Sequence, residues 1–310
     1  MKRLGLAGLW AFGWVVLAPA QVTVEIRLEQ DQFLPGEAIP AAVRITNRSG
    51  QTLSLGETDD WLTFSVERRD GTESIVPKIG EVPVQGPFEL ETSKIATKRV
   101  DLAPYFNFGP VGRYAVVATL HVPGWDREII SPPRVFQIIN GTRMWEREFG
   151  LPSTSGEPPE TRRYILQQAN YLRGQIRLYL RIADGAGFHS LQVRPIGTIL
   201  SFSRPEPQLD KNSNLHLLYQ NGPRSFSYHV FNPDGEVLTE EVYDYLESRP
   251  RLRVDDEGNV KVVGGVRRRT AAEIAGSITN VPPAPVLPPG VPPQDVPPPD
   301  PNPPSPEPEP

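Results

Sequence analysis

The sequence predicts an all-β protein, and two observations carry this prediction. Short runs in which apolar and polar residues alternate, the period of a half-buried strand, recur along the 310 residues. Turn signals rich in Gly, Pro, Asn and Asp separate these runs at close intervals. The chain has no cysteine, which excludes a disulfide framework and a thiolate metal site. Its length allows about two domains, and we expect two β domains followed by a disordered proline-rich tail.

Residues 1–20 predict a signal peptide. Two basic residues open the chain, an apolar run extends from Leu4 to Leu17, and Ala18-Pro19-Ala20 places small residues at a cleavage site before Gln21. The run is shorter than the roughly 20 residues of a membrane span. We therefore expect an exported protein, periplasmic, cell-surface or extracellular, with no transmembrane span after cleavage. An uncleaved anchor is the alternative.

Residues 21–139 predict a β-sandwich of about seven short strands. The first strand is indicated by Val22, Val24, Ile26 and Leu28, which alternate with polar residues. Further runs follow, and a long strand of the buried type is expected at 112–120, before a closing strand near 135–138.

Three features of this stretch resemble bacterial immunoglobulin-like sandwich domains of secreted proteins. They are Pro35-Gly36-Glu37 before a strand, Asn47 at the end of that strand, and the late motif Gly112-x-Tyr114-x-Val116-x-Ala118. The resemblance covers residues 21–139 and lacks the cysteine pair of that family. It implies adhesion, spacing or display more often than catalysis. It also implies a tyrosine corner, in which the Tyr114 hydroxyl bonds back to nearby backbone.

A linker is expected at 140–160, because 152–159 is rich in Pro, Ser and Gly. Trp145 and Phe149 lie four residues apart, which allows a helical turn at the start of this linker. Residues 161–266 then predict a second, antiparallel β domain.

The clearest part of this second domain is a three-stranded meander at 215–245. Turn signals at 221–224 and 232–235 separate its strands, and Pro223 belongs in the first loop because it cannot donate to a ladder. With a loop of two or four residues, the expected cross-strand pairs are Tyr219 with Phe226, Leu217 with Tyr228, and Leu215 with Val230. This register places His216 opposite His229.

Two places in this domain have residue types that bind metals. His216 and His229, if paired, would have Cβ atoms about 5 Å apart, close enough to share a metal, although buried structural histidines are the simpler interpretation. Asp210, Asn212 and Asn214 have the spacing that opens a calcium loop, but Leu215 replaces the required glycine. We therefore expect no metal and no other cofactor.

After Gly265 the chain changes in composition. Residues 267–280 predict a short helix or linker, with Thr270 and Glu273 at capping-box spacing. Residues 281–310 are about half proline and predict a disordered tail, either a stiff spacer or a ligand for an aromatic-lined groove.

The function that these observations favour is non-catalytic binding or scaffolding at the cell envelope, with an envelope protein or a polysaccharide as partner. Common hydrolase and phosphate-binding motifs are absent, so we expect no enzyme. A mixed charge distribution with a net charge of −5 argues against nucleic acid as a partner.

One alternative function is a carbohydrate-binding module, with Trp61, Trp125 and Trp145 as candidate binding residues. The other is a protease inhibitor of the sandwich type that presents residues 77–87.

Overall fold

A computed structural model of the protein describes residues 21–71, 74–151, 160–171, 174–187 and 190–269. The predicted signal peptide at 1–20 and the predicted tail at 281–310 lie outside these residues, as does nearly all of the helix or linker expected at 267–280. No helix of the described part is long and apolar enough to cross a membrane.

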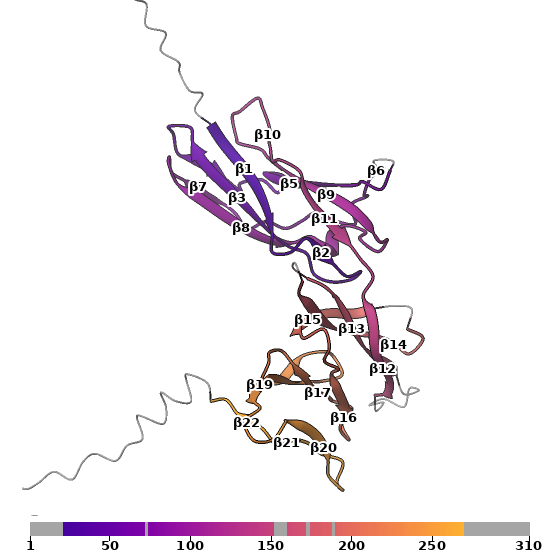
Figure 1. Ribbon diagram of the computed structural model, residues 1–310. Coiled ribbons are helices and arrows are strands. Elements are labelled where there is room, and N and C mark those ends of the chain that lie inside the picture. Colours follow the sequence, from indigo (N-terminus) through magenta and orange to yellow (C-terminus); the bar gives the residue numbers. More distant parts are fainter. Residues whose placement is uncertain (1–20, 72–73, 152–159, 172–173, 188–189, 270–310) are drawn as a thin grey trace, which may run out of the picture. The chain divides into compact units, whose positions relative to one another are not determined.

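The described residues form an all-β protein with several small antiparallel sheets, as the sequence predicts (Figure 1). Only a short 3-10 helix, Ala103–Tyr105, interrupts the strands in this part of the chain. The first eleven strands are β1 (Gln21–Leu28), β2 (Gln32–Phe33), β3 (Pro40–Arg48), β4 (Leu53–Leu55), β5 (Leu62–Arg68), β6 (Ser74–Ile75), β7 (Phe88–Leu90), β8 (Ile95–Asp101), β9 (Gly112–Leu120), β10 (Ile129–Ile130) and β11 (Arg134–Ile138).

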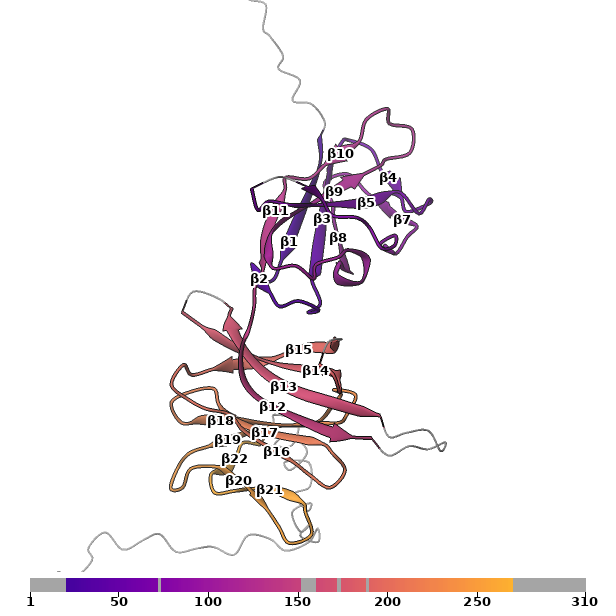
Figure 2. The same ribbon diagram turned by 90° about the vertical axis from the view of Figure 1, so that its right-hand side faces the viewer.

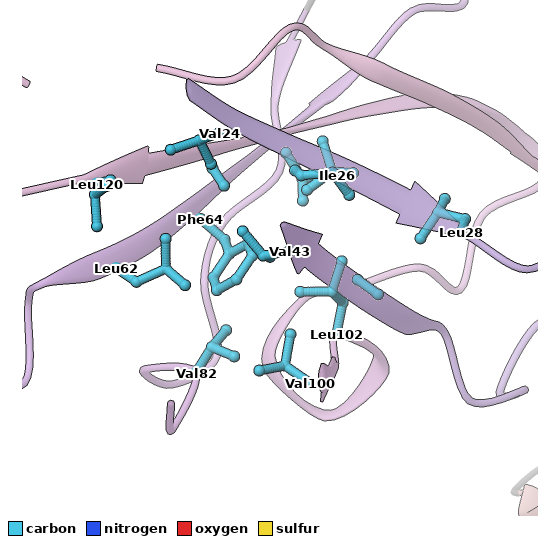
Figure 3. Packing of buried hydrophobic residues seen from close by; sticks show 14 of the residues in the cluster. Val24, Ile26, Leu28, Val43, Leu62, Phe64, Val82, Val100, Leu102 and Leu120 are labelled. Carbon is cyan, nitrogen blue, oxygen red and sulfur yellow. The ribbon is translucent and has the colours of Figure 1, made fainter. Parts of the chain in front are cut away.

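Two sheets of this first region share one apolar core. One sheet has the order β1-β3-β8, and the other has the order β2-β11-β9-β5-β6 with β10 beside β9. The alternation expected for β1 is present, because Val22, Val24 and Ile26 are buried whereas Glu25 and Arg27 are exposed. Figure 3 shows β1 side chains gathered with Val43 of β3 and Phe64 of β5 in this core.

A hydrogen bond of Tyr114 closes the connection that enters β9. The Tyr114 ring is 1% exposed, and its hydroxyl donates to the carbonyl oxygen of Pro110 at 2.7 Å. Its ring stacks on Phe136 of the neighbouring strand β11, with ring centroids 5.7 Å apart. This is the type of hydrogen bond that the immunoglobulin-like resemblance implies for Tyr114.

The remaining strands form a second core. They are β12 (Thr142–Gly150), β13 (Thr161–Asn170), β14 (Ile176–Asp184), β15 (Ser190–Ile199), β16 (Glu206–Leu209), β17 (Leu215–Gln220), β18 (Ser225–Phe231), β19 (Val237–Asp244), β20 (Arg251–Val254), β21 (Val260–Val263) and β22 (Val266–Arg267). The sheets β12-β13-β14-β15 and β16-β17-β18-β19-β22 share an apolar cluster that includes Tyr164, Leu180 and Leu217.

The linker expected at 140–160 is wrong for its first half. Residues 142–150 form β12, which pairs with β13 from Thr142 to Gly150 with a bulge between Arg143 and Trp145 (Figure 2). Trp145 and Phe149 share a face of this strand, and the Phe149 ring stacks on Tyr164 with centroids 4.2 Å apart. A spacing of four residues matches one face of a helix and also one face of a strand, so it could not distinguish the two.

The meander at 215–245 is present as β17, β18 and β19, but its predicted register is wrong by one residue. His216 faces Val230 and Leu217 faces His229, because the first hairpin has a three-residue loop, Gly222 to Arg224. The amides of both Asn221 and Gly222 donate to the carbonyl oxygen of Ser225. A shift of one residue moves every side chain to the other face, so the predicted pairing of His216 with His229 is also wrong.

A third, smaller apolar cluster joins residues of the first region to residues of the second. Leu34, which follows β2 and is 1% exposed, packs with Ala169, Tyr179 and Val193. The two large cores therefore meet across a small apolar contact that excludes water.

Candidate functional site

The three candidate tryptophans do not form one aromatic surface. Trp61 is 2% exposed, and its ring meets Phe88 edge to face with centroids 5.6 Å apart. Trp145 is half-buried against the core of the second region. Trp125 is half-buried against the core of the first region, in the loop between β9 and β10. Trp125 and Trp145 are thus both partly accessible, and Trp125 is the one that lines the hollow described next.

Trp125 lines an open hollow of about 540 Å³, within the usual size range of ligand sites. The other lining residues are polar or small: Ser49, Gln51, Gly124, Asp126 and Arg127. The Arg127 guanidinium lies 5.7 Å from the centroid of the Trp125 ring, at cation–π distance. An indole ring next to hydroxyl, amide, carboxylate and guanidinium groups offers both apolar and hydrogen-bonding contacts to a ligand.

The loop that carries Trp125 is anchored at its base. The Trp125 amide donates to the carbonyl oxygen of Val122 at 3.0 Å, and Val122 is buried in the core. Gly124 has a φ of +77°, a conformation that a residue with a Cβ adopts only with strain. The backbone turn that carries the indole is therefore well defined, and the indole packs against the first core.

His216 belongs to a buried hydrogen-bond chain with Asp210 and Tyr228. Its Nδ1 lies 2.7 Å from the Tyr228 hydroxyl, and its Nε2 lies 3.2 Å from an Asp210 carboxylate oxygen. Burial, together with the nearby carboxylates of Glu241 and Asp210, raises the pKa of Tyr228 to about 12, so this hydroxyl keeps its proton. These three side chains therefore join the loop before β17 to β17 and β18 through hydrogen bonds.

The Asp210 carboxylate is engaged by its own loop. It accepts from the backbone amides of Asn212 and Asn214, from the Asn214 side chain and from His216. Burial raises the pKa of Asp210, but these hydrogen bonds together outweigh burial and the pKa is lowered. The one-three-five spacing noted in the sequence thus closes the turn between β16 and β17.

His229 lies on the opposite face of the sheet from His216. Its ring stacks on Tyr219 and on Phe231, each with centroids 5.7 Å apart. Burial lowers the pKa of His229, so the imidazole is neutral in the folded protein at neutral pH. His216 and His229 cannot bind the same metal from opposite faces, and no group of three or more potential metal ligands occurs among the described residues.

A buried polar network, which sequence reasoning missed, lies where the two regions meet. The Glu37 carboxylate, in a side chain 3% exposed, accepts from the Gln30 side chain and the Leu34 amide, each at 2.8 Å. Arg177 donates to the side-chain oxygen of Gln30 at 2.7 Å. Burial raises the pKa of Glu37 above its ordinary value. Glu37 belongs to the Pro35-Gly36-Glu37 motif, but sequence spacing gave no signal that it is buried or that Arg177 is near.

The loop proposed for protease inhibition is held against the first core. Within residues 77–87, Val82 is buried, and the Val84 carbonyl accepts from the Trp61 indole at 3.4 Å. Its most accessible apolar side chain is Ile79, which is 69% exposed.

No protein-family model matches this chain, and no curated protein matches it. Among solved structures, the chain is similar to Spo0M, a sporulation control protein from Bacillus subtilis, with 14% sequence identity and a TM-score of 0.28. The alignment covers 64% of this chain and 78% of Spo0M.

Proposed function

We propose that this chain is a non-catalytic binding protein, exported to the cell envelope, whose first region is an immunoglobulin-like sandwich. The single observation that carries the binding role is the hollow at Trp125, an aromatic ring fixed on an anchored loop and surrounded by polar groups. The shared core of two sheets and the hydrogen bond from Tyr114 to Pro110 support the immunoglobulin-like assignment.

The composition of the hollow favours a polysaccharide over an envelope protein as partner. A protein interface is usually anchored by a cluster of apolar side chains, whereas Trp125 stands alone among polar neighbours. A sugar ring presents both C–H faces and hydroxyl groups, which match the Trp125 ring, the Gln51 amide and the Asp126 carboxylate.

Affinity electrophoresis of the chain starting at Gln21, in gels containing soluble β-glucan, xylan or peptidoglycan fragments, tests this proposal. We expect retardation in one of these gels and a loss of affinity of tenfold or more in Trp125→Ala. Trp145→Ala is the matched control, because Trp145 is also half-buried but packs on the other core.

Crosslinking of the same chain to envelope fractions separates the two partners. Capture of one discrete protein that Trp125→Ala abolishes would replace the polysaccharide by a protein partner. If Trp125→Ala binds every partner as tightly as the unmodified chain, the hollow is not the binding site and the proposal fails.

A further inference from the structure

A second hollow, larger than the one at Trp125, lies on a different surface and is lined by both polar and apolar groups. It encloses about 890 Å³, beside the outer face of β2, β11 and β9. Its lining residues are Asp31, Gln32, Arg113, Arg134, Val135, Phe136, Gln137, Asn170, Tyr171 and Gly174. None of these residues lines the hollow at Trp125.

Strand register places three of these polar side chains in one row across the sheet. Gln137 of β11 pairs with Gln32 of β2 on one side and with Arg113 of β9 on the other. Residues that face each other in adjacent strands point to the same side of a sheet, so an amide, a second amide and a guanidinium stand side by side. This side faces away from the core, because the next residues, Tyr114 and Phe136, are buried.

The two glutamine side chains of this row have donors and acceptors that remain free to bind a ligand. The Gln32 amide nitrogen donates to the Gln137 side-chain oxygen at 3.2 Å, which leaves one amide nitrogen and one amide oxygen without another partner among the described residues. Across the hollow, the Asn170 amide and the Tyr171 hydroxyl add further groups that can donate and accept. Such a lining fits a ligand rich in hydroxyl groups.

The charge of the hollow comes from Arg113. The two other charged lining residues neutralise each other, because Arg134 donates to an Asp31 carboxylate oxygen at 2.5 Å. Nearby Asp70 accepts from the Arg113 backbone amide and from the Arg68 side chain, and no side-chain hydrogen bond or ion pair of Arg113 occurs within the described ranges. A guanidinium presents its donors in a fork that matches a carboxylate.

We propose that this hollow binds an acidic oligosaccharide, with one ligand carboxylate on Arg113 and ligand hydroxyl groups on Gln32, Gln137 and Asn170. The volume lies within the range of sites that bury a small ligand. An acidic peptide is the less favoured ligand, since the site lies on a sheet face and offers no row of apolar pockets for alternate side chains.

Titration calorimetry of the chain starting at Gln21 with trigalacturonate tests the proposal. We expect binding that weakens at least tenfold in Arg113→Gln and less in Arg113→Lys. Binding should not change in Arg253→Gln, because Arg253 is an exposed arginine of β20 that lines neither hollow. The trimethyl ester of the same sugar, which has no carboxylate, should bind at least tenfold more weakly. Binding should also weaken as salt concentration rises. Thermal unfolding of each variant confirms that it is folded.

Several results would overturn this inference. They are no binding of trigalacturonate at millimolar concentration, equal binding of the methyl ester, and unchanged binding in a folded Arg113→Gln variant. Tighter binding of triglutamate than of trigalacturonate would assign the hollow to a peptide instead. Loss of binding in Trp125→Ala but not in Arg113→Gln would place the sugar at Trp125, which supports the proposed function and rejects this second site.

Discussion

At the scale of single residues, the position of Glu37 shows how burial changes the role of a carboxyl group. In the sequence, Glu37 is one of three residues of a turn motif. In the fold it lies beneath Gln30 and Leu34, and both carboxylate oxygens accept a hydrogen bond. Its raised pKa means that the folded protein holds this proton more tightly than the unfolded chain does.

Substituting Glu37→Gln should therefore change how stability depends on pH. In the wild type, protonation of Glu37 contributes to the free energy of unfolding at low pH, and this contribution is lost as pH rises through the folded-state pKa. The variant has no such group. We expect the wild-type stability minus that of the variant to fall as pH rises above about 4.5, the ordinary pKa of the group, measured by urea unfolding. A difference that stays constant with pH would contradict this.

Removal of the Tyr114 hydroxyl tests the hydrogen bond that closes the entry to β9. Tyr114→Phe keeps the ring packing on Phe136 and loses the 2.7 Å bond to Pro110. We expect a loss of about 1 kcal/mol in the free energy of unfolding, from denaturant titration. Tyr105→Phe is the control, because the half-buried Tyr105 makes no side-chain hydrogen bond within the described ranges. Equal losses in the two variants would show that the bond does not stabilise the fold.

At the scale of elements, the hairpin of β17 and β18 shows what a sequence pattern can and cannot establish. Strand positions and the turn at Pro223 followed from alternation and turn residues. Register did not, because a loop of three residues and a loop of two or four both keep Pro223 out of the ladder. The alternation of apolar and polar residues also suggested a sheet with one buried face. Both faces of β17 are buried, because Leu217 and Leu218, which point to opposite faces, are each at most 1% exposed.

Burial of both faces makes this hairpin sensitive to acid through His229. Burial lowers the pKa of His229, so the stability that the neutral ring contributes is lost as pH falls below about 6.5, where the unfolded chain takes up a proton first. His229→Phe keeps an aromatic ring between Tyr219 and Phe231. We expect the variant to lose less stability than the wild type between about pH 7.5 and pH 5.5, measured by urea unfolding. If the wild type and the variant lose equal stability over this pH range, protonation of His229 does not destabilise the folded protein.

At the scale of the whole described molecule, the contact around Leu34 joins the two cores. Leu34 is supplied by the loop after β2, and its partners Ala169, Tyr179 and Val193 come from β13, β14 and β15. The sequence could not predict this contact, because it depends on positions far apart in the chain. For the same reason, the row of Gln32, Gln137 and Arg113 could not be seen before strand order was known.

Leu34→Asp should uncouple the two regions. A carboxylate at this buried site costs on the order of 3 kcal/mol and opens the contact to water. In calorimetry of the chain starting at Gln21, we expect one unfolding transition for the wild type and two for the variant. Leu246→Asp is the control, because Leu246 is 60% exposed and its substitution should change stability by less than about 0.5 kcal/mol. A single transition in Leu34→Asp would show that other contacts suffice to couple the regions.

The parallel pairing of β2 with β11 determines when the first region can fold during synthesis. Gln32 and Gln137 are partners across a separation of 105 residues, so β2 lacks the strand it pairs with in the described residues until the ribosome has released β11. The contacts that close this core are among the slowest to form, because a long loop must be ordered first. A nascent chain that stops before Ile138 therefore leaves Phe33 and the adjoining apolar surface exposed, and it is the natural target for chaperones and proteases.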